Sequence, residues 1–146
     1  MSLFSSLSVS ASGMNAQRTR AELLVENLAN AETTRTPEGG PYRRKDVVFQ
    51  SEAVGSPFAS VLADEMNGGG STGVGTSDTL IDQRDPEMRY MPGHPDAGPD
   101  GYVAFPRLNP AEEMVDLVSA SRGYQANVAS MTSIKEMIQR SIDLLK

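Results

Sequence analysis

Two long helical patterns at the ends of the chain limit most strongly what this sequence can fold into. Apolar residues recur at intervals of seven near each terminus. A seven-residue repeat keeps these side chains on one side of a supercoiling helix, and that side has to pack against another helix. The first repeat consists of Leu7, Met14, Ala21 and Leu28, and the second of Leu117, Tyr124, Met131, Ile138 and Leu145.

The middle of the chain, residues 34–107, differs from both ends in composition. It holds 11 of the 13 glycines and eight of the nine prolines, which interrupt helices and favour turns. Apolar and β-branched runs between the turns predict strands. These strands are expected at residues 42–50, 74–83, 87–91 and 102–105.

These patterns together predict an α+β fold. We expect two long terminal helices that form an antiparallel-type coiled-coil pair, with a β-rich middle insertion between them. The predicted parts are an N-terminal helix of an assembly core (1–33), a β-rich middle domain with a flexible Gly-rich loop (34–107), and a C-terminal helix of the same core (108–146).

Local signals predict where several helices begin and end. Asn109 followed by Pro110 predicts the start of the last helix, since Asn caps a helix and Pro suits its first position. Asn27 and Asn30 are expected to close the first helix, because Asn tolerates the left-handed conformation that ends helices. A further short helix is expected at residues 56–62.

The charge distribution argues against a nucleic-acid partner. The net charge is −6, and residues 32–107 carry 12 acids and seven bases, a charge of −5. Binding to phosphates needs a concentrated positive field instead. The basic residues 43–45 are interpreted as a solvated strand edge, and the adjacent acids Glu112 and Glu113 as a solvated helix face.

Other classes are also disfavoured by composition. The chain has no cysteine, so no disulfide or thiolate metal site is expected. No run of 18 apolar residues is present, so we expect no membrane-spanning segment. The N-terminal region lacks a basic stretch and is rich in serine, so we expect no cleaved secretory signal.

The only histidine, His94, lies near Asp96 and Asp100 and is the one candidate for metal chemistry. One imidazole and two carboxylates in a Pro-Gly loop lack the second histidine and rigid spacing of a typical metal site. We therefore expect no metal, no cofactor, no catalytic residue and no enzymatic activity. A metal-dependent hydrolase built on this loop remains the weak alternative.

Three segments resemble a known family. Residues 27–34 read NLANAETT and continue as RTPEGGPYRRK, residues 92–97 read PGHPDA followed by DGYV at 100–103, and residues 113–128 contain EMVDL and SASRGYQANV. The chain resembles the flagellar basal-body rod proteins, and within them the C-type proteins of the proximal rod. The resemblance covers nearly the whole chain and is weakest at residues 51–85.

This resemblance implies a structural subunit of the proximal rod, which transmits motor torque through the periplasm. Such subunits leave the cell through the flagellar type III export apparatus without a cleaved signal peptide. The implied partners are other rod subunits, further copies of this chain and adjacent basal-body ring proteins. The two heptad repeats, together with Asn27 and Asn30, are the expected assembly interface. Another axial subunit, or a secreted binding module that grips a receptor with its helix pair, remains the alternative.

Overall fold

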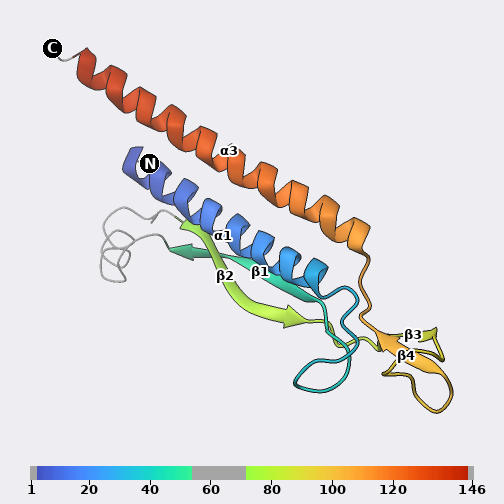
Figure 1. Cartoon of the computed structure of the whole chain (residues 1–146). Helices are drawn as coiled ribbons and strands as arrows, with labels where there is room; N and C mark the ends of the chain where they lie inside the picture. The colour runs from blue at the N-terminus through green and yellow to red at the C-terminus, as the bar shows by residue number, and fades with distance from the viewer. Residues whose placement is uncertain (1–2, 54–71, 145–146) are drawn as a thin grey trace. The chain divides into compact units, whose positions relative to one another are not determined.

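The computed structural model describes residues 3–53 and 72–144, which contain two long helices and two small sheets (Figure 1). The fold is therefore mixed α+β, as expected. The elements in chain order are α1 (Leu3–Ala29), β1 (Lys45–Ala53), β2 (Thr72–Ile81), β3 (Glu87–Tyr90), β4 (Tyr102–Phe105) and α3 (Pro110–Asp143).

Most predicted elements within these residues are present. The predicted strand at 102–105 coincides with β4, and the last helix begins at Pro110 as predicted. Strand β1 begins at Lys45 rather than at Tyr42, because the Tyr42 N–H donates instead to the Thr33 carbonyl, at 3.0 Å. The predicted helix at 56–62 and most of the Gly-rich loop lie outside the described residues.

The two sheets are both two-stranded. β1 pairs with β2, and β3 pairs with β4 in antiparallel register. The Asp82 N–H donates to the Arg44 carbonyl, at 2.9 Å, so the sheet of β1 and β2 continues just beyond its strand ends. A two-stranded sheet has few residues to bury, so both sheets depend on packing against other elements.

The start of α3 and the end of α1 are stabilised in different ways. At the start of α3, the Ala111 N–H donates to the Asn109 Oδ1, at 3.1 Å, which confirms the predicted Asn cap. At the end of α1, no described residue other than glycine has a positive φ. The expected left-handed closure by Asn27 and Asn30 is therefore wrong. Asn30 instead donates from its side chain to the Glu26 carbonyl, at 2.9 Å, and Asn27 lies inside the helix.

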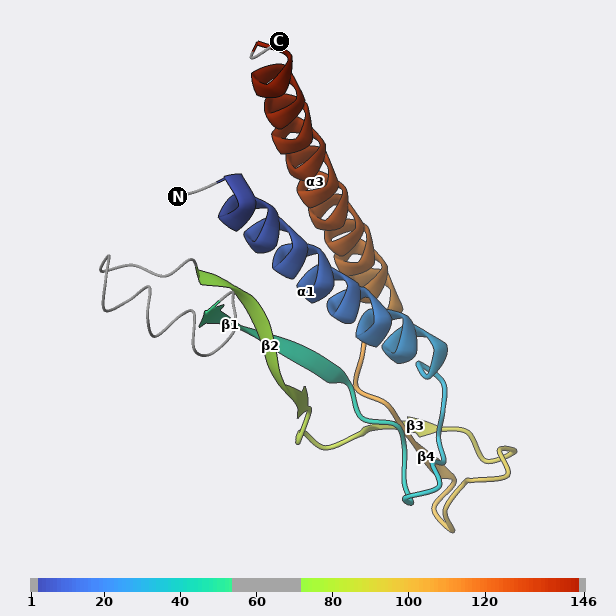
Figure 2. The ribbon, with the colours of Figure 1, turned by 90° about the vertical axis from the view of Figure 1, so that its left-hand side faces the viewer.

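The chain folds into two compact units. Among the described residues, unit 1 comprises 3–19, 48–53, 72–77 and 119–144, and unit 2 comprises 20–47 and 78–118. In unit 1, α1 lies between the β1–β2 ribbon and α3 (Figures 1 and 2).

Each unit has a small core. The buried apolar residues of unit 1 are Ala16, Ala120 and Ile134, and those of unit 2 are Leu24, Tyr42, Val103 and Phe105. No helix in the described part of the chain is long and apolar enough to cross a membrane.

Candidate assembly site

The predicted interface residues differ in how far the chain itself covers them. Asn27 is fully buried, at 0% exposure, whereas Tyr124 is 42% exposed. Leu145 lies outside the described residues. The others are half-buried, and they are Leu7, Met14, Ala21, Leu28, Asn30, Leu117, Met131 and Ile138. Of the predicted set, Asn27 is the residue that organises a site within the chain.

Asn27 uses every hydrogen-bonding position of its side-chain amide. Its Nδ2 donates to the Lys45 carbonyl, at 2.8 Å, and to the Glu113 Oε2, at 3.0 Å. Its Oδ1 accepts from the Tyr42 hydroxyl and from the Lys45 N–H, both at 2.9 Å. A primary amide has two donors and two acceptor lone pairs, so this buried side chain is fully satisfied.

Glu113 extends this network to α3. Its side chain is buried, and its Oε1 accepts from the Arg44 Nε at 2.5 Å. Arg44 also pairs with Asp46, at 3.0 Å. A buried carboxylate is tolerated only when it is paired and hydrogen-bonded. The amide of Asn27 and the guanidinium of Arg44 together meet that requirement.

Tyr42 and Lys45 complete the same cluster. Lys45 Nζ pairs with the Glu26 Oε1 at 2.5 Å and lies 5.8 Å from the centre of the Tyr42 ring. Burial, followed by the negative charges of Glu26 and Glu113, raises the pKa of Tyr42 to about 12. The Tyr42 hydroxyl therefore stays protonated and continues to donate to Asn27 over the whole neutral range.

Two interpretations made from the sequence are wrong at this site. Residues 43–45 are not simply a solvated strand edge, because Arg44 and Lys45 are half-buried and ion-paired. Glu113 is not on a solvated helix face, because it is 2% exposed. The missed signal is long-range: residues 44 and 113 are 69 positions apart, and no local spacing joins them.

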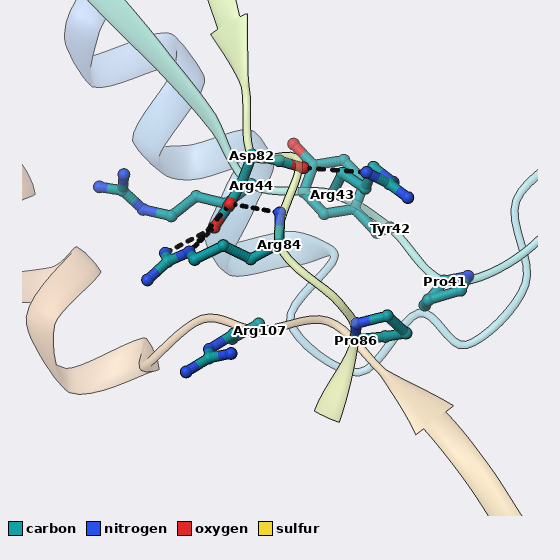
Figure 3. A pocket seen from close by; sticks show the side chains of 8 residues that line it. All are labelled: Pro41, Tyr42, Arg43, Arg44, Asp82, Arg84, Pro86 and Arg107. Carbon is teal, nitrogen blue, oxygen red and sulfur yellow. Dashed lines mark hydrogen bonds and ion pairs between the residues drawn. The ribbon is translucent and has the colours of Figure 1, made fainter. Parts of the chain in front are cut away.

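A small cavity of about 40 Å³ lies beside the network in unit 2 (Figure 3). Asp82 accepts from the Nε and Nη2 of Arg84 and from the Arg84 backbone N–H. These hydrogen bonds hold the pKa of Asp82 down at about 2. The cavity is lined by Pro41, Tyr42, Arg43, Arg44, Asp82, Arg84, Pro86 and Arg107.

The side chains of the His94 loop contact the loop backbone and neighbouring side chains of the chain. The His94 Nδ1 accepts from the Asp96 N–H at 3.1 Å, and the imidazole lies 6.2 Å from the Phe105 ring. The Asp96 carboxylate accepts from the Thr34 hydroxyl, at 2.8 Å. Within residues 3–53 and 72–144, no three carboxylate or imidazole groups are close enough to hold a metal ion.

In unit 1, α1 and α3 meet through glycines and amides. A Cβ added at Gly13 would lie 3.0 Å from the Asn127 amide, and one added at Gly123 would lie 3.1 Å from the Gln17 amide carbon. The buried Oε1 of Gln17 has no hydrogen-bond partner within the described residues. Each helix thus presents a glycine to an amide of the other helix.

Comparison with known proteins finds similarity to flagellar basal-body rod proteins in each case reported below. Residues 100–144 match the family model described as flagellar basal body rod FlgEFG protein C-terminal. The flagellar basal-body rod protein FlgC of Bacillus subtilis is 43% identical, with all of both chains covered. FlgC of Borreliella burgdorferi is 38% identical over 100% of this chain and 99% of that protein. FlgC of Escherichia coli O157:H7 is 35% identical over 99% of this chain and 98% of that protein. These matches indicate no enzymatic family.

Proposed function

The chain belongs to the flagellar basal-body rod protein FlgC family, whose members are structural components of the rod. From this premise, we propose that it assembles with copies of itself and with other rod subunits through its terminal helices. In that position it transmits motor torque across the periplasm.

The observation that carries this proposal is the apolar surface left uncovered on α3. This helix has 34 residues and is therefore about 51 Å long. A single chain that exposes so many large apolar side chains on one helix gains stability when another surface covers them. The exposed residues of α3 are Met114, Val115, Val118, Tyr124, Val128, Met137 and Ile142.

The finer architecture is proposed on the same basis. We propose that α1 and α3 pair as an antiparallel-type coiled coil in the assembled rod, with the β-rich middle as an insertion that projects outward. The heptad residues pack against helices of neighbouring subunits, as half-buried Leu117, Met131 and Ile138 would allow.

The route to this position is also proposed. The chain is exported through the flagellar type III apparatus without a cleaved signal peptide, and it joins the periplasmic part of the basal body. There it contacts other rod subunits, and adjacent basal-body ring proteins are further candidate partners.

Electron microscopy of isolated basal bodies tests the proposal. A strain that lacks this chain is expected to be non-motile and to form basal bodies without a complete rod. The double variant Met131→Asp, Ile138→Asp should reproduce this defect at normal expression, because it places charges in the proposed helix interface. The matched control is Glu136→Asp, Arg140→Lys on the same turns of α3. Complete rods in the deletion strain would contradict the proposed function.

A further inference from the structure

The loop between β3 and β4 is held by a chain of side-chain contacts that begins at His94. The side chain of His94 is 27% exposed. Its Nδ1 accepts from the Asp96 N–H at 3.1 Å, and its ring meets the Phe105 ring edge to face. The Asp96 Oδ2 accepts in turn from the Thr34 hydroxyl, at 2.8 Å. Thr34 lies 62 positions earlier, in the connection between α1 and β1, so this last hydrogen bond ties two loops of unit 2 together.

The hydrogen bond between Asp96 and His94 requires a neutral imidazole. A neutral imidazole has one N–H donor and one acceptor nitrogen. Because Nδ1 accepts from the Asp96 N–H, the proton of the neutral ring is on Nε2. A second proton occupies Nδ1 and turns this acceptor into a donor. The imidazolium form of His94 therefore cannot keep its hydrogen bond to the Asp96 N–H.

The Asp96 carboxylate is within reach of a protonated Nδ1. Its Oδ2 lies 4.0 Å from the His94 Nδ1, whereas a hydrogen bond between a charged N–H and a carboxylate is about 2.7–2.9 Å long. The carboxylate therefore has to move about 1 Å toward the imidazolium to form one. The same oxygen accepts from Thr34, and the Asp96 N–H loses its own acceptor at the same time. Both changes act on the residue that carries the tie to Thr34.

Other charged groups near His94 belong to β3 and to the connection after α1. Arg89 of β3 lies over the same aromatic ring that the imidazole contacts, 4.9 Å from its centre, and pairs with Glu87 at 3.1 Å. Glu32, in the connection after α1, acts electrostatically on Arg89. In the described part of the chain, the acid that lies within ion-pair distance of His94 is Asp96. The charge of the imidazole therefore acts most directly on Asp96.

We propose that protonation of His94 releases the tie between Thr34 and Asp96, so that the loop between β3 and β4 is fixed at neutral pH and freed in mild acid. Histidine is the side chain that ordinarily changes its charge between pH 5 and 8. Neutral His94 holds the Asp96 backbone and leaves the carboxylate to Thr34. The imidazolium withdraws that acceptor and attracts the carboxylate. This switch goes beyond the proposed function, because all its contacts lie within one chain.

An NMR titration of the purified, ¹⁵N-labelled full-length chain from pH 8.0 to pH 5.5 tests the switch. We expect the amide signals of Asp96 and of residues 33–36 to shift with one common midpoint, because the two loops are coupled through Thr34. The heteronuclear NOE of the His94, Asp96 and Ala97 amides should fall in the acidic form, since a freed loop moves more on the picosecond to nanosecond timescale.

Three variants separate the titrating group from the tie that transmits its effect. His94→Asn offers an amide oxygen in place of Nδ1 and does not titrate, so neither loop should shift between pH 8.0 and pH 5.5. Thr34→Val has no hydroxyl, so the Asp96 amide should still titrate while residues 33–36 stay unchanged. The matched control Thr34→Ser keeps the hydroxyl and should behave as the wild type does.

Several outcomes would overturn the inference. Residues 33–36 that stay unchanged in the wild type, or that still shift in Thr34→Val, would show that the hydroxyl transmits nothing. Shifts that persist in His94→Asn would assign the titration to another group. A heteronuclear NOE that rises in acid would show that the imidazolium tightens the loop instead. The comparison of the wild type with His94→Asn decides the inference even where Thr34→Val fails to fold.

Discussion

The contacts between α1 and α3 differ in kind between the two units. In unit 2, Asn27 and Glu113 are buried and have all their hydrogen-bonding groups satisfied by Tyr42, Arg44 and Lys45. In unit 1, glycines face amide side chains, and the buried Gln17 Oε1 has no hydrogen-bond partner among residues 3–53 and 72–144. Both contacts are polar. Among the described residues, only the contact in unit 2 gives each of its buried polar side chains a hydrogen-bond partner.

The difference shows what each contact does for the fold. A satisfied buried network requires one arrangement of its members, because any shift leaves a polar group without a partner. A contact between glycines and amides imposes no such requirement. We therefore expect unit 2 to hold its helices in a fixed register, and unit 1 to tolerate rearrangement when another subunit binds.

The largest effect is expected for Asn27→Leu. This change removes four hydrogen bonds and takes the Asn27 partner away from the Tyr42 hydroxyl, the Lys45 backbone N–H and carbonyl, and the Glu113 Oε2 in a buried site. Each such group costs about 1–3 kcal/mol, so the free energy of unfolding should fall by about 3–5 kcal/mol. Urea unfolding of the full-length chain, followed by tyrosine fluorescence, measures this change.

The matched control is Asn15→Leu, which makes the same substitution at an exposed position of α1. It should change the free energy of unfolding by no more than about 0.5 kcal/mol. Equal destabilisation by the two variants would show that the network does not set the register of unit 2.

A smaller effect that depends on pH is expected for Tyr42→Phe. The variant loses one hydrogen bond to Asn27, which at neutral pH should lower the free energy of unfolding by about 1–2 kcal/mol. Urea titrations of wild type and variant from pH 7 to pH 12 measure the difference. Tyr90→Phe serves as the control because Tyr90 is 65% exposed and lies outside the network.

The direction of the pH dependence follows from the pKa. The pKa of Tyr42 is raised in the folded chain from its ordinary value of 10.0 to about 12. Its protonated form therefore contributes stability that is fully present below pH 10 and is lost as the pH rises toward 12. The stability difference between wild type and Tyr42→Phe should shrink over that interval. A difference that stays constant would contradict the burial of this hydroxyl.

The sequence predicts the elements better than the network that joins them. The start of α3 follows from Asn109 and Pro110, which act on adjacent residues, and β4 follows from a short apolar run between turns. Asn27 is recognisable as part of a motif, but its predicted role as a helix cap is wrong. Its real partners are Tyr42, Lys45 and Glu113, and sequence spacing carries no signal for side chains brought together by folding.

The seven-residue repeat has a related limit. It correctly predicts long helices near both ends, because periodicity reports which residues share one side of a helix. It does not report what covers that side. Tyr124 belongs to the repeat and is 42% exposed, whereas buried Ala120 and Ile134 lie outside it. Burial against another subunit is therefore still a prediction for the repeat residues.

The smallest effect is expected for Gln17→Met, and its sign is opposite to that of Asn27→Leu. The two side chains have similar length and similar helix propensity, so the change mainly removes the buried Oε1, which has no partner in the part of the chain that the structure describes. Loss of an unsatisfied polar group should raise the local stability of unit 1 by about 1 kcal/mol. Hydrogen exchange of the α1 amides in residues 10–19 should then slow about fivefold.

The control for this last prediction is Gln125→Met, the same substitution at an exposed position of α3. It should leave exchange in residues 10–19 unchanged, because Gln125 is on a solvent-exposed part of the helix. If Gln17→Met instead speeds exchange, the Gln17 acceptor has a partner in solution and the unit 1 contact is as complete as that of unit 2. If it slows exchange but impairs rod assembly, the polar group is retained for a donor on a neighbouring subunit. That result would explain why a chain keeps an acceptor that weakens its own helix contact.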